Sequence, residues 1–320
     1  MNIKPILIVT GEPFSIFSEI LFKTLKKNKF KKPIIIIGSY NLLYDQMKSL
    51  KYRIQFNKIK KNFNYKDIKN NKLNIIDIKF IYKNIFEKIS SKSYSYNHEC
   101  FSTALKLLKS KKFSGLINGP ISKKHFLKGK YLGITEFLAQ KTNTKNFVML
   151  IFNKKLAVSP VSTHIPLKNV YKTISKKKII NHVQVIKRFY KKYFKKDPKI
   201  AITGLNPHCE SNFKTSEEDK IIKPSLKILK KIYSSVSGPY PADSLFMKNN
   251  IKKFDVIVGM YHDQVLTPIK TIYNFDAINI TLGLPFIRIS PDHGTNNQMI
   301  GKNKSNPQSL ISAIKFLDTK

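Results

Sequence analysis

The chain contains the sequence FDVIVGMYHDQVLTPIK at positions 254–270, followed by AINITLGLPFIRISPDHGT at positions 277–295. Each segment begins with a β-branched apolar run, which is typical of a buried strand, and continues into a polar loop. The first loop contains Tyr-His-Asp-Gln, and the second contains Arg288 with an Asp-His-Gly-Thr sequence. In α/β proteins, ligands bind in loops that follow the C-terminal ends of strands. This stretch therefore predicts an active site.

Strand-like and helix-like segments alternate through the rest of the chain. Buried strands are predicted at 4–10, 33–38, 73–76, 115–118, 147–152, 156–162 and 200–203, and helices at 15–27, 97–109, 176–193, 217–234 and 310–317. Pro224 predicts a break or a kink in the helix at 217–234. Residues 48–72 are expected to be irregular and exposed, and GPYP at 238–241 is expected to form a stiff turn. Such alternation favours parallel sheets, and 320 residues favour a two-lobed α/β protein.

The chain is strongly basic, with 59 Lys and Arg residues against 19 Asp and Glu residues, a net charge of +40. Only Arg53, Arg188 and Arg288 are arginines. Proteins that read nucleic acid rely on the bidentate contacts of arginine, so a specific nucleic-acid partner is not expected. The lysines are spread along the chain among Ile, Asn, Tyr and Phe, as AT-rich codon usage would produce. We interpret them as a solvated surface.

Targeting and redox signals are also weak. No apolar run approaches the roughly 20 residues that span a bilayer, and the N-terminal sequence lacks the apolar region of a signal peptide. Two cysteines, Cys100 and Cys209, give no disulfide framework. We therefore expect a cytoplasmic protein with no membrane partner.

Three histidines share one context: His164, His208 and His262 each follow a β-rich run at its polar end. Imidazole is a common ligand of divalent metals, so these are candidate metal ligands. Taken singly, each would more often be an ordinary loop or core histidine, and such long spacings are not a metal motif by themselves.

Other polar residues near these loops are candidates for catalysis or binding. Asp243 and Asp263 are candidates to orient a histidine or to accept a proton, with helix capping as the alternative for Asp243. Lys270, Asn279 and Arg288 are candidates to bind a phosphate or carboxylate. Arg288 is the most informative of these because arginine is rare in this chain. No GxGxxG or Walker A sequence is present.

In this order, the motifs resemble the 4-hydroxythreonine-4-phosphate dehydrogenase family of vitamin B6 biosynthesis. The matching segments are NGPISK at 118–123, GITEFLA at 133–139, STHIPL at 162–167, GLNPH at 204–208, GPYPADSLF at 238–246, YHDQ at 261–264, NITLGLPFIR at 279–288 and DHGT at 292–295. They are collinear from Asn118 to the end of the chain.

The resemblance implies a two-domain α/β/α fold like that of isocitrate and isopropylmalate dehydrogenases, and not a Rossmann fold. The first domain would comprise residues 1–139 with 281–320, and the second residues 140–280. The active site would lie in the cleft between them at a homodimer interface, with one metal-binding histidine supplied by the other subunit.

The resemblance also implies an activity. An NAD-dependent enzyme, with NADP as the alternative cofactor, would oxidise 4-hydroxythreonine 4-phosphate to 2-amino-3-oxo-4-(phosphonooxy)butanoate, which decarboxylates to 3-amino-2-oxopropyl phosphate. One divalent metal per site (zinc, magnesium or cobalt) would lower the pKa of the substrate hydroxyl. Asp243 or Asp263 would accept a proton or orient a histidine. The family positions are His164, His208 and His262 for metal, Thr135, Lys270, Asn279 and Arg288 for substrate, and Asp292, His293, Gly294 and Thr295 near the cofactor.

Two departures from the family pattern stand out. Ile134 occupies the histidine position of a GHTE motif, and GEPFSIFSE at 11–19 replaces a pattern close to GDPAGIGPE. Isoleucine cannot hydrogen-bond through its side chain, and residues bulkier than glycine change the freedom of a loop backbone. We expect a working but weaker enzyme, with a shifted substrate as the alternative.

Two further functions remain open. One is a paralogous dehydrogenase for another phosphorylated or carboxylated hydroxy acid. The other is a catalytically decayed, basic polyanion-binding protein. The three histidines and Arg288 are all present, which argues against decay, because an inactive enzyme is expected to lose at least one of them.

Overall fold

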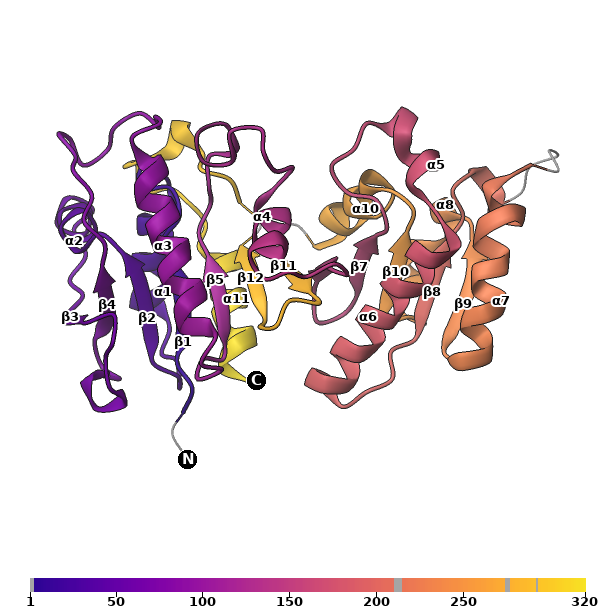
Figure 1. Ribbon diagram of the computed structural model, residues 1–320, viewed down its shortest axis with the longest axis horizontal. Coiled ribbons are helices and arrows are strands. Elements are labelled where there is room, and N and C mark those ends of the chain that lie inside the picture. The colour runs from indigo at the N-terminus through magenta and orange to yellow at the C-terminus, as the bar shows by residue number, and fades with distance from the viewer. Residues whose placement is uncertain (1–2, 210–214, 274–276, 292) are drawn as a thin grey trace. The chain divides into compact units, whose positions relative to one another are not determined.

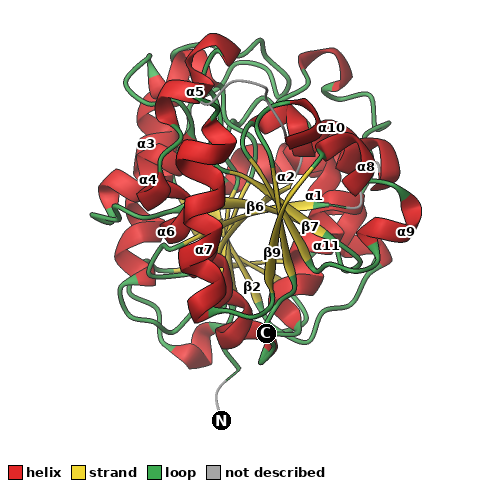
Figure 2. Cartoon of the chain, turned by 90° about the vertical axis from the view of Figure 1, so that its right-hand side faces the viewer, coloured by secondary structure: helices red, strands yellow, loops and turns green. Residues whose placement is uncertain are grey.

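The computed structural model describes residues 3–209, 215–273, 277–291 and 293–320. The chain forms two compact units (Figure 1): unit 1 comprises Met1–Leu138 with Pro285–Lys320, and unit 2 comprises Ala139–Leu284. In both units the strands lie in the interior and helices cover them on either side (Figure 2). Among the residues described, no helix is long and apolar enough to cross a membrane.

Unit 1 contains a parallel sheet. Its strand order is β3–β4–β2–β1–β5–β12, and each pairing recorded among these strands is parallel, as the alternation of elements predicted. The strands are β1 (Ile6–Val9), β2 (Ile34–Gly38), β3 (Phe56–Ile59), β4 (Leu73–Asp77), β5 (Gly115–Asn118) and β12 (Arg288–Pro291).

Helices cover the sheet of unit 1 because its central strands are apolar on both faces. All four residues of β1 are 0% exposed, as expected for a parallel strand covered on both sides. Helix α1 (Phe17–Lys27) packs against α2 (Tyr40–Ser49) and α11 (Gln308–Asp318), and α3 (Ser93–Leu108) packs against β1 and β2. The shorter helices are η1 (Tyr65–Asp67), η2 (Lys123–Leu127), α4 (Ile134–Lys141) and η6 (Asn297–Met299).

Unit 2 contains a mixed sheet with the order β11–β6–β7–β10–β8–β9. The strands β7, β10, β8 and β9 are parallel, whereas β6 is antiparallel to β7 and β11. A short connection such as that between β6 and β7 can join only antiparallel strands. The strands are β6 (Val148–Phe152), β7 (Ala157–Pro160), β8 (Ile200–Thr203), β9 (Val236–Tyr240), β10 (Val256–Gly259) and β11 (Ile278–Leu282).

The helices of unit 2 lie on both faces of this sheet. Helix α6 (Lys176–Phe194) packs against β6, β11 and α7 (Lys223–Ile232), whereas α10 (His262–Tyr273) packs against β7 and β10. Figure 2 shows α6 and α7 on one side of the strands and α10 on the other. The shorter helices are η3 (Leu167–Asn169), α5 (Val170–Thr173), η4 (Pro207–Cys209), η5 (Glu218–Ile222), α8 (Ala242–Leu245) and α9 (Lys248–Ile251).

Several local predictions were wrong. Residues 48–72 are not irregular throughout, because 56–59 form β3, which pairs with β4. The expected turn at 238–241 lies largely within β9. No break is observed at Pro224: the π-helical η5 ends at Ile222 and continues directly into α7 at Lys223, with Pro224 in the first turn of α7.

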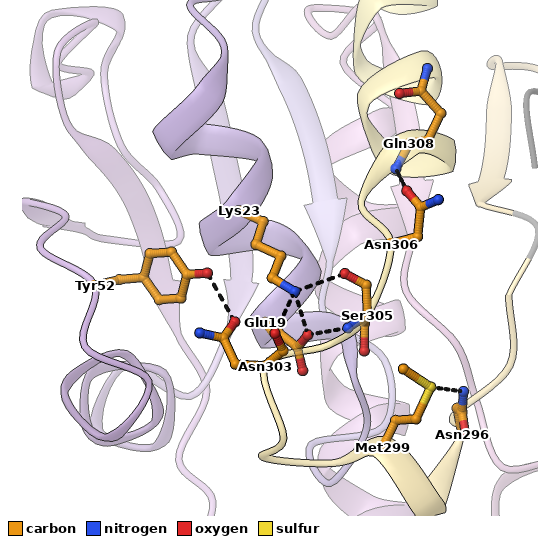
Figure 3. A network of polar contacts seen from close by, with 9 residues as sticks. All are labelled: Glu19, Lys23, Tyr52, Asn296, Met299, Asn303, Ser305, Asn306 and Gln308. Atoms are coloured by element: carbon orange, nitrogen blue, oxygen red, sulfur yellow. Dashed lines mark hydrogen bonds and ion pairs between the residues drawn. The ribbon is translucent and has the colours of Figure 1, made fainter.

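A polar network joins α1 to the segment that precedes α11 (Figure 3). The carboxylate of Glu19, 1% exposed, accepts hydrogen bonds from Lys23 Nζ at 2.8 Å and from the Ser305 amide at 2.5 Å. Lys23 Nζ also donates to the carbonyls of Asn303 and Ser305, each at 2.9 Å. The N-terminal helix thereby holds the C-terminal part of unit 1 in place.

Candidate active site

In unit 1, the predicted substrate residues Thr135 and Arg288 lie together. Arg288 is the first residue of β12 rather than part of a loop as predicted, and it is 1% exposed. Its Nε donates to Oδ1 of Asn118 at 2.7 Å, and its Nη1 donates to Oγ1 of Thr135 at 3.2 Å. The guanidinium of Arg288 on β12 is thus hydrogen-bonded to residues at the end of β5 and in the first turn of α4.

The guanidinium of Arg288 is buried and charged. Burial lowers its pKa to about 10, while the carboxylate of Glu136 acts in the opposite direction, so the group stays positive at neutral pH. Asn118 and Thr135 are neutral, and their hydrogen bonds fix the guanidinium without neutralising it. A fixed, partly desolvated arginine is well suited to bind phosphate or carboxylate.

The residue that departs from the family pattern lies beside this cluster. Ile134 is the first residue of α4 and is half-buried, directly before Thr135. Its side chain places an apolar group where the family pattern has an imidazole. The substrate cluster is therefore formed without that hydrogen-bonding group.

The expected cofactor region is described only in part, because Asp292 lies outside the described residues. Nδ1 of His293 donates to the Gly294 carbonyl at 3.2 Å, and the space around the Cα of Gly294 is open. The carbonyl of Thr295 accepts a hydrogen bond at 3.2 Å from the amide of Ile16. The altered N-terminal loop therefore contacts the region predicted to lie near the cofactor.

Glu12, in the same N-terminal loop, is a buried carboxyl group that the sequence analysis missed. It is 1% exposed, and its Oε2 accepts a hydrogen bond from Ser93 Oγ at 2.8 Å. Burial raises its pKa to about 7, although the hydrogen bonds from Ser93 and from the Phe14 amide lower it in part. Phe14 in this loop and Phe17 at the start of α1 are each 2% exposed, so both aromatic rings are buried.

In unit 2, two of the three candidate metal ligands are neighbours. His164 follows β7 and His262 begins α10 after β10, and these strands are parallel neighbours. Their ring centroids are 5.8 Å apart. Nδ1 of His262 donates to Oδ1 of Asp263 at 2.8 Å, so Nε2 is the ring nitrogen that faces away from this carboxylate.

His208 follows β8, the other parallel neighbour of β10. It lies in η4 with φ of 59° and is exposed, whereas Cys209 beside it is buried. Burial raises the pKa of the Cys209 thiol, and the charges of Glu218 and Asp243 add to this. His208 and Cys209 therefore lie in different environments, and the thiol is a poor ligand candidate.

The remaining candidates of unit 2 lie on three elements. Asp243 is exposed in the first turn of α8, where its Oδ1 accepts the Ser244 amide at 2.7 Å, as a helix-terminal carboxylate does. Lys270 is exposed on α10, two turns beyond His262. Asn279 lies in β11, and its Oδ1 is buried with no hydrogen-bond partner among the described residues.

A divalent metal fits this donor set in part. Within the described residues of one chain, no three His, Cys, Asp or Glu side chains are placed to hold a metal. His164 and His262 nevertheless provide neighbouring imidazoles. The carboxylate of Asp263 accepts a hydrogen bond from Nδ1 of His262, as carboxylates commonly do from metal-binding histidines. The three-histidine site with a ligand from a second subunit stays a prediction.

Comparison with known proteins shows what the chain resembles. The family model of the pyridoxal phosphate biosynthetic protein PdxA matches residues 29–317. A 4-hydroxythreonine-4-phosphate dehydrogenase from Sulfurihydrogenibium sp. (strain YO3AOP1) is 38% identical over 97% of this chain and 96% of its own length. A putative D-threonate 4-phosphate dehydrogenase from Oceanobacillus iheyensis is 32% identical over 98% of this chain and 97% of its own.

Solved structures agree with the fold. A putative 4-hydroxythreonine-4-phosphate dehydrogenase from Salmonella typhimurium has a TM-score of 0.86 at 28% identity, covering 99% of both chains. Isocitrate dehydrogenase from Methylococcus capsulatus has a TM-score of 0.50 at 11% identity, covering 97% of this chain and 83% of its own. The expected likeness to isocitrate dehydrogenase, and not to a Rossmann fold, is confirmed.

Proposed function

Because the chain belongs to the family of the pyridoxal phosphate biosynthetic protein PdxA, we propose that it is a 4-hydroxythreonine-4-phosphate dehydrogenase of vitamin B6 biosynthesis. It oxidises the substrate hydroxyl to give 2-amino-3-oxo-4-(phosphonooxy)butanoate, which loses carbon dioxide and yields 3-amino-2-oxopropyl phosphate. The observation that supports this most directly is the contact between Arg288 and Thr135, two family substrate positions separated by 153 residues in sequence.

The residues of unit 1 bind the anionic part of the substrate. Arg288 supplies the positive charge, and Asn118 and Thr135 hold its guanidinium in one orientation. Lys270 and Asn279 are further proposed substrate residues, on the basis of the family positions alone. A substrate held at several points presents its reacting carbon in a fixed position, which is the main contribution of such binding groups to the rate.

We assign the metal to His164, His208 and His262, with one histidine supplied by the partner subunit of a homodimer. A divalent ion (zinc, magnesium or cobalt) bound there lowers the pKa of the substrate hydroxyl. Asp263 orients His262 through Nδ1. Asp243, exposed in the first turn of α8, is the proposed proton acceptor.

A nicotinamide cofactor, NAD or alternatively NADP, would supply the hydride acceptor for this oxidation. We place it near residues 292–295, of which Asp292 lies outside the described part of the chain. The open space at Gly294 supports this placement, because a cofactor can approach the backbone closely at that point. The contact between Ile16 and Thr295 brings the N-terminal loop to the same region.

The test is the appearance of NADH absorbance with 4-hydroxythreonine 4-phosphate, measured before and after chelation. We expect chelation to abolish turnover and added zinc, magnesium or cobalt to restore it. Turnover that survives complete metal removal would contradict the metal assignment. Co-expression of His208→Ala with His262→Ala tests the shared site, because activity returns if these two histidines serve one site from different subunits.

D-threonate 4-phosphate is the second candidate substrate, favoured by the full-length similarity to the Oceanobacillus iheyensis relative, and Ile134 keeps a changed substrate open. The two substrates differ at C2, which bears an amino group in one and a hydroxyl in the other. Parallel assays decide between them through the ratio of their kcat/KM values. Tight polyanion binding at physiological salt without turnover of either would instead support the decayed, basic binding protein.

A further inference from the structure

We propose that Gln264 is a positioning residue that fixes the loops on which each subunit carries His164, His208 and His262, and thereby sets the metal affinity of the sites to which that subunit contributes ligands. This inference rests on the proposed function, because it assumes that these histidines bind a metal. It concerns residues of unit 2 only, and each contact it uses lies within that unit.

The first half of the network joins the loops after β7 and β10 through Met260. The Met260 amide donates to Oε1 of Gln264 at 2.7 Å. The Met260 carbonyl accepts both the amide of Ser162 at 3.1 Å and its hydroxyl at 2.7 Å. Met260 is 0% exposed and Ser162 is 2% exposed. Since Ser162 and Met260 each precede a candidate ligand by two residues, these bonds set the spacing of His164 and His262.

The second half of the network joins the loop after β8 to the side-chain amide of Gln264. Oε1 of Gln264 also accepts the hydroxyl of Thr203 at 2.8 Å, and Nε2 donates to the Gly204 carbonyl at 2.8 Å. Both ends of the side-chain amide are therefore used, and they bridge β10 to β8. A Cβ on Gly259 would lie 3.1 Å from Oε1 of Gln264 and 2.4 Å from a methyl of Val265, so this close approach requires glycine.

Glu218 extends the restraint toward His208. Its carboxylate accepts the amides of Leu205 at 2.7 Å and Asn206 at 2.8 Å, and the Asn206 side-chain amide at 2.7 Å. Burial alone would raise the pKa of Glu218, but the hydrogen bonds from Asn206 and Leu205 lower it below its usual value. The backbone is thus held up to two residues before His208.

A purely structural role would also explain these bonds, because buried polar groups at strand ends need partners. The two roles differ in what they predict for metal binding. Outer residues that orient metal ligands change metal affinity by about 10- to 100-fold when mutated. A residue that only satisfies buried polar groups changes stability and leaves the affinity alone.

The protein is the metal-free, full-length chain without a histidine tag. It is titrated with Co²⁺ alone, and visible absorption gives the Co²⁺ dissociation constant. The melting temperature of each variant is recorded as well. Gln264→Leu is expected to weaken Co²⁺ binding by about 10- to 100-fold. Ser162→Ala is expected to weaken it by a few fold, because the backbone bond to Met260 remains. Thr203→Val removes only one bond to Gln264, and a loss of a few fold is expected there even if Gln264→Leu fails to fold.

Two control variants lose comparable buried contacts elsewhere. Ser159 is 0% exposed on β7, where its hydroxyl donates to the Met149 carbonyl at 2.5 Å and accepts from His182 Nε2 at 2.7 Å. Gln46 is 1% exposed in unit 1, where its amide donates to the carbonyls of Pro13 and Ile85. We expect Ser159→Ala and Gln46→Leu to lower the melting temperature but to leave the Co²⁺ dissociation constant within about twofold.

The outcomes separate the inference from the function on which it rests. Weaker Co²⁺ binding in the Gln264, Ser162 and Thr203 variants, with unchanged binding in both controls, supports the positioning role. Wild-type affinity in the folded Gln264 or Thr203 variant overturns it while leaving the metal site intact. If the wild-type protein itself binds no Co²⁺, the metal assignment fails, and the positioning role fails with it.

Discussion

Replacing Glu12 by Gln is expected to stabilise the protein in a pH-dependent way. Glu12 is 1% exposed, and burial raises its pKa from 4.5 to about 7. At about 1.4 kcal/mol for each pH unit, this difference corresponds to about 3 kcal/mol. Because the folded state holds the proton more tightly than the unfolded chain, this stability is fully present below pH 4.5. It is lost as the pH rises through 7.

The assay is urea unfolding followed by circular dichroism at pH 5, 6, 7 and 8 for the wild type and Glu12→Gln. Glutamine does not ionise, and its side chain can still accept the Ser93 hydroxyl. We therefore expect the two free energies of unfolding to lie close together at pH 5. The variant is expected to become more stable with rising pH, by about 2 to 3 kcal/mol at pH 8.

A difference between the two proteins that stays constant from pH 5 to 8 would refute this reasoning, because it would mean that Glu12 ionises without cost in the folded state. Glu99→Gln is the matched control. Glu99 is an exposed residue of α3 that pairs with Lys61 at 2.7 Å, and such surface pairs contribute at most about 1 kcal/mol. Its replacement removes the same charge and is expected to leave the shape of the pH profile unchanged.

Three further predictions concern other residues. Ile134→His is expected to lower the KM for 4-hydroxythreonine 4-phosphate about 10- to 150-fold by restoring a hydrogen bond to a charged substrate; no gain in affinity would contradict the lost-contact explanation. Arg288→Lys removes the bonds to Asn118 and Thr135 and is expected to reduce kcat/KM by about 100-fold in steady-state assays, whereas the exposed Arg188→Lys retains wild-type rates. Burial lowers the pKa of His182 to about 3, so the free energy of unfolding is expected to fall by about 2 kcal/mol between pH 6.5 and 5. Urea titrations should show that the free energy of unfolding of His182→Gln falls less between pH 6.5 and 5 than that of the wild type. An equal fall in both proteins would exclude His182 as the cause.

The sequence alone predicted most buried elements, because their apolar runs match the period of the structure they form. The strands at 115–118 and 200–203 were placed at their observed bounds, and the long helix at 176–193 ends one residue from its observed end. Such segments are buried on one or both sides, so the hydrophobic pattern is strong. The assignment of Thr135 and Arg288 to the substrate positions followed from the family resemblance, whereas their mutual contact was not predicted.

What the sequence could not predict depends on contacts between distant segments. β3 has two half-buried residues and one exposed residue, so its pattern is weak, and only pairing with β4 makes it a strand. The burial of Glu12 requires α3, which supplies Ser93 from 81 residues away. The role of Asn118 was hidden in the same way, because its partner Arg288 lies 170 residues further along the chain. No local pattern indicates these contacts.

The division of the chain between the two units has a consequence for biosynthesis. Unit 1 is made of two pieces, and the whole of unit 2, Ala139–Leu284, is translated between them. A nascent chain that has reached Leu284 thus contains all of unit 2 but only a partial unit 1, without β12 and α11. The hydrogen bonds of Glu19 and Lys23 with Asn303 and Ser305 can form only after the C-terminal piece has been synthesised. Arg288 is likewise among the last site residues to be translated. Domains fold as units during translation, so unit 2 can fold first and the anion-binding arginine is added only near the end of synthesis.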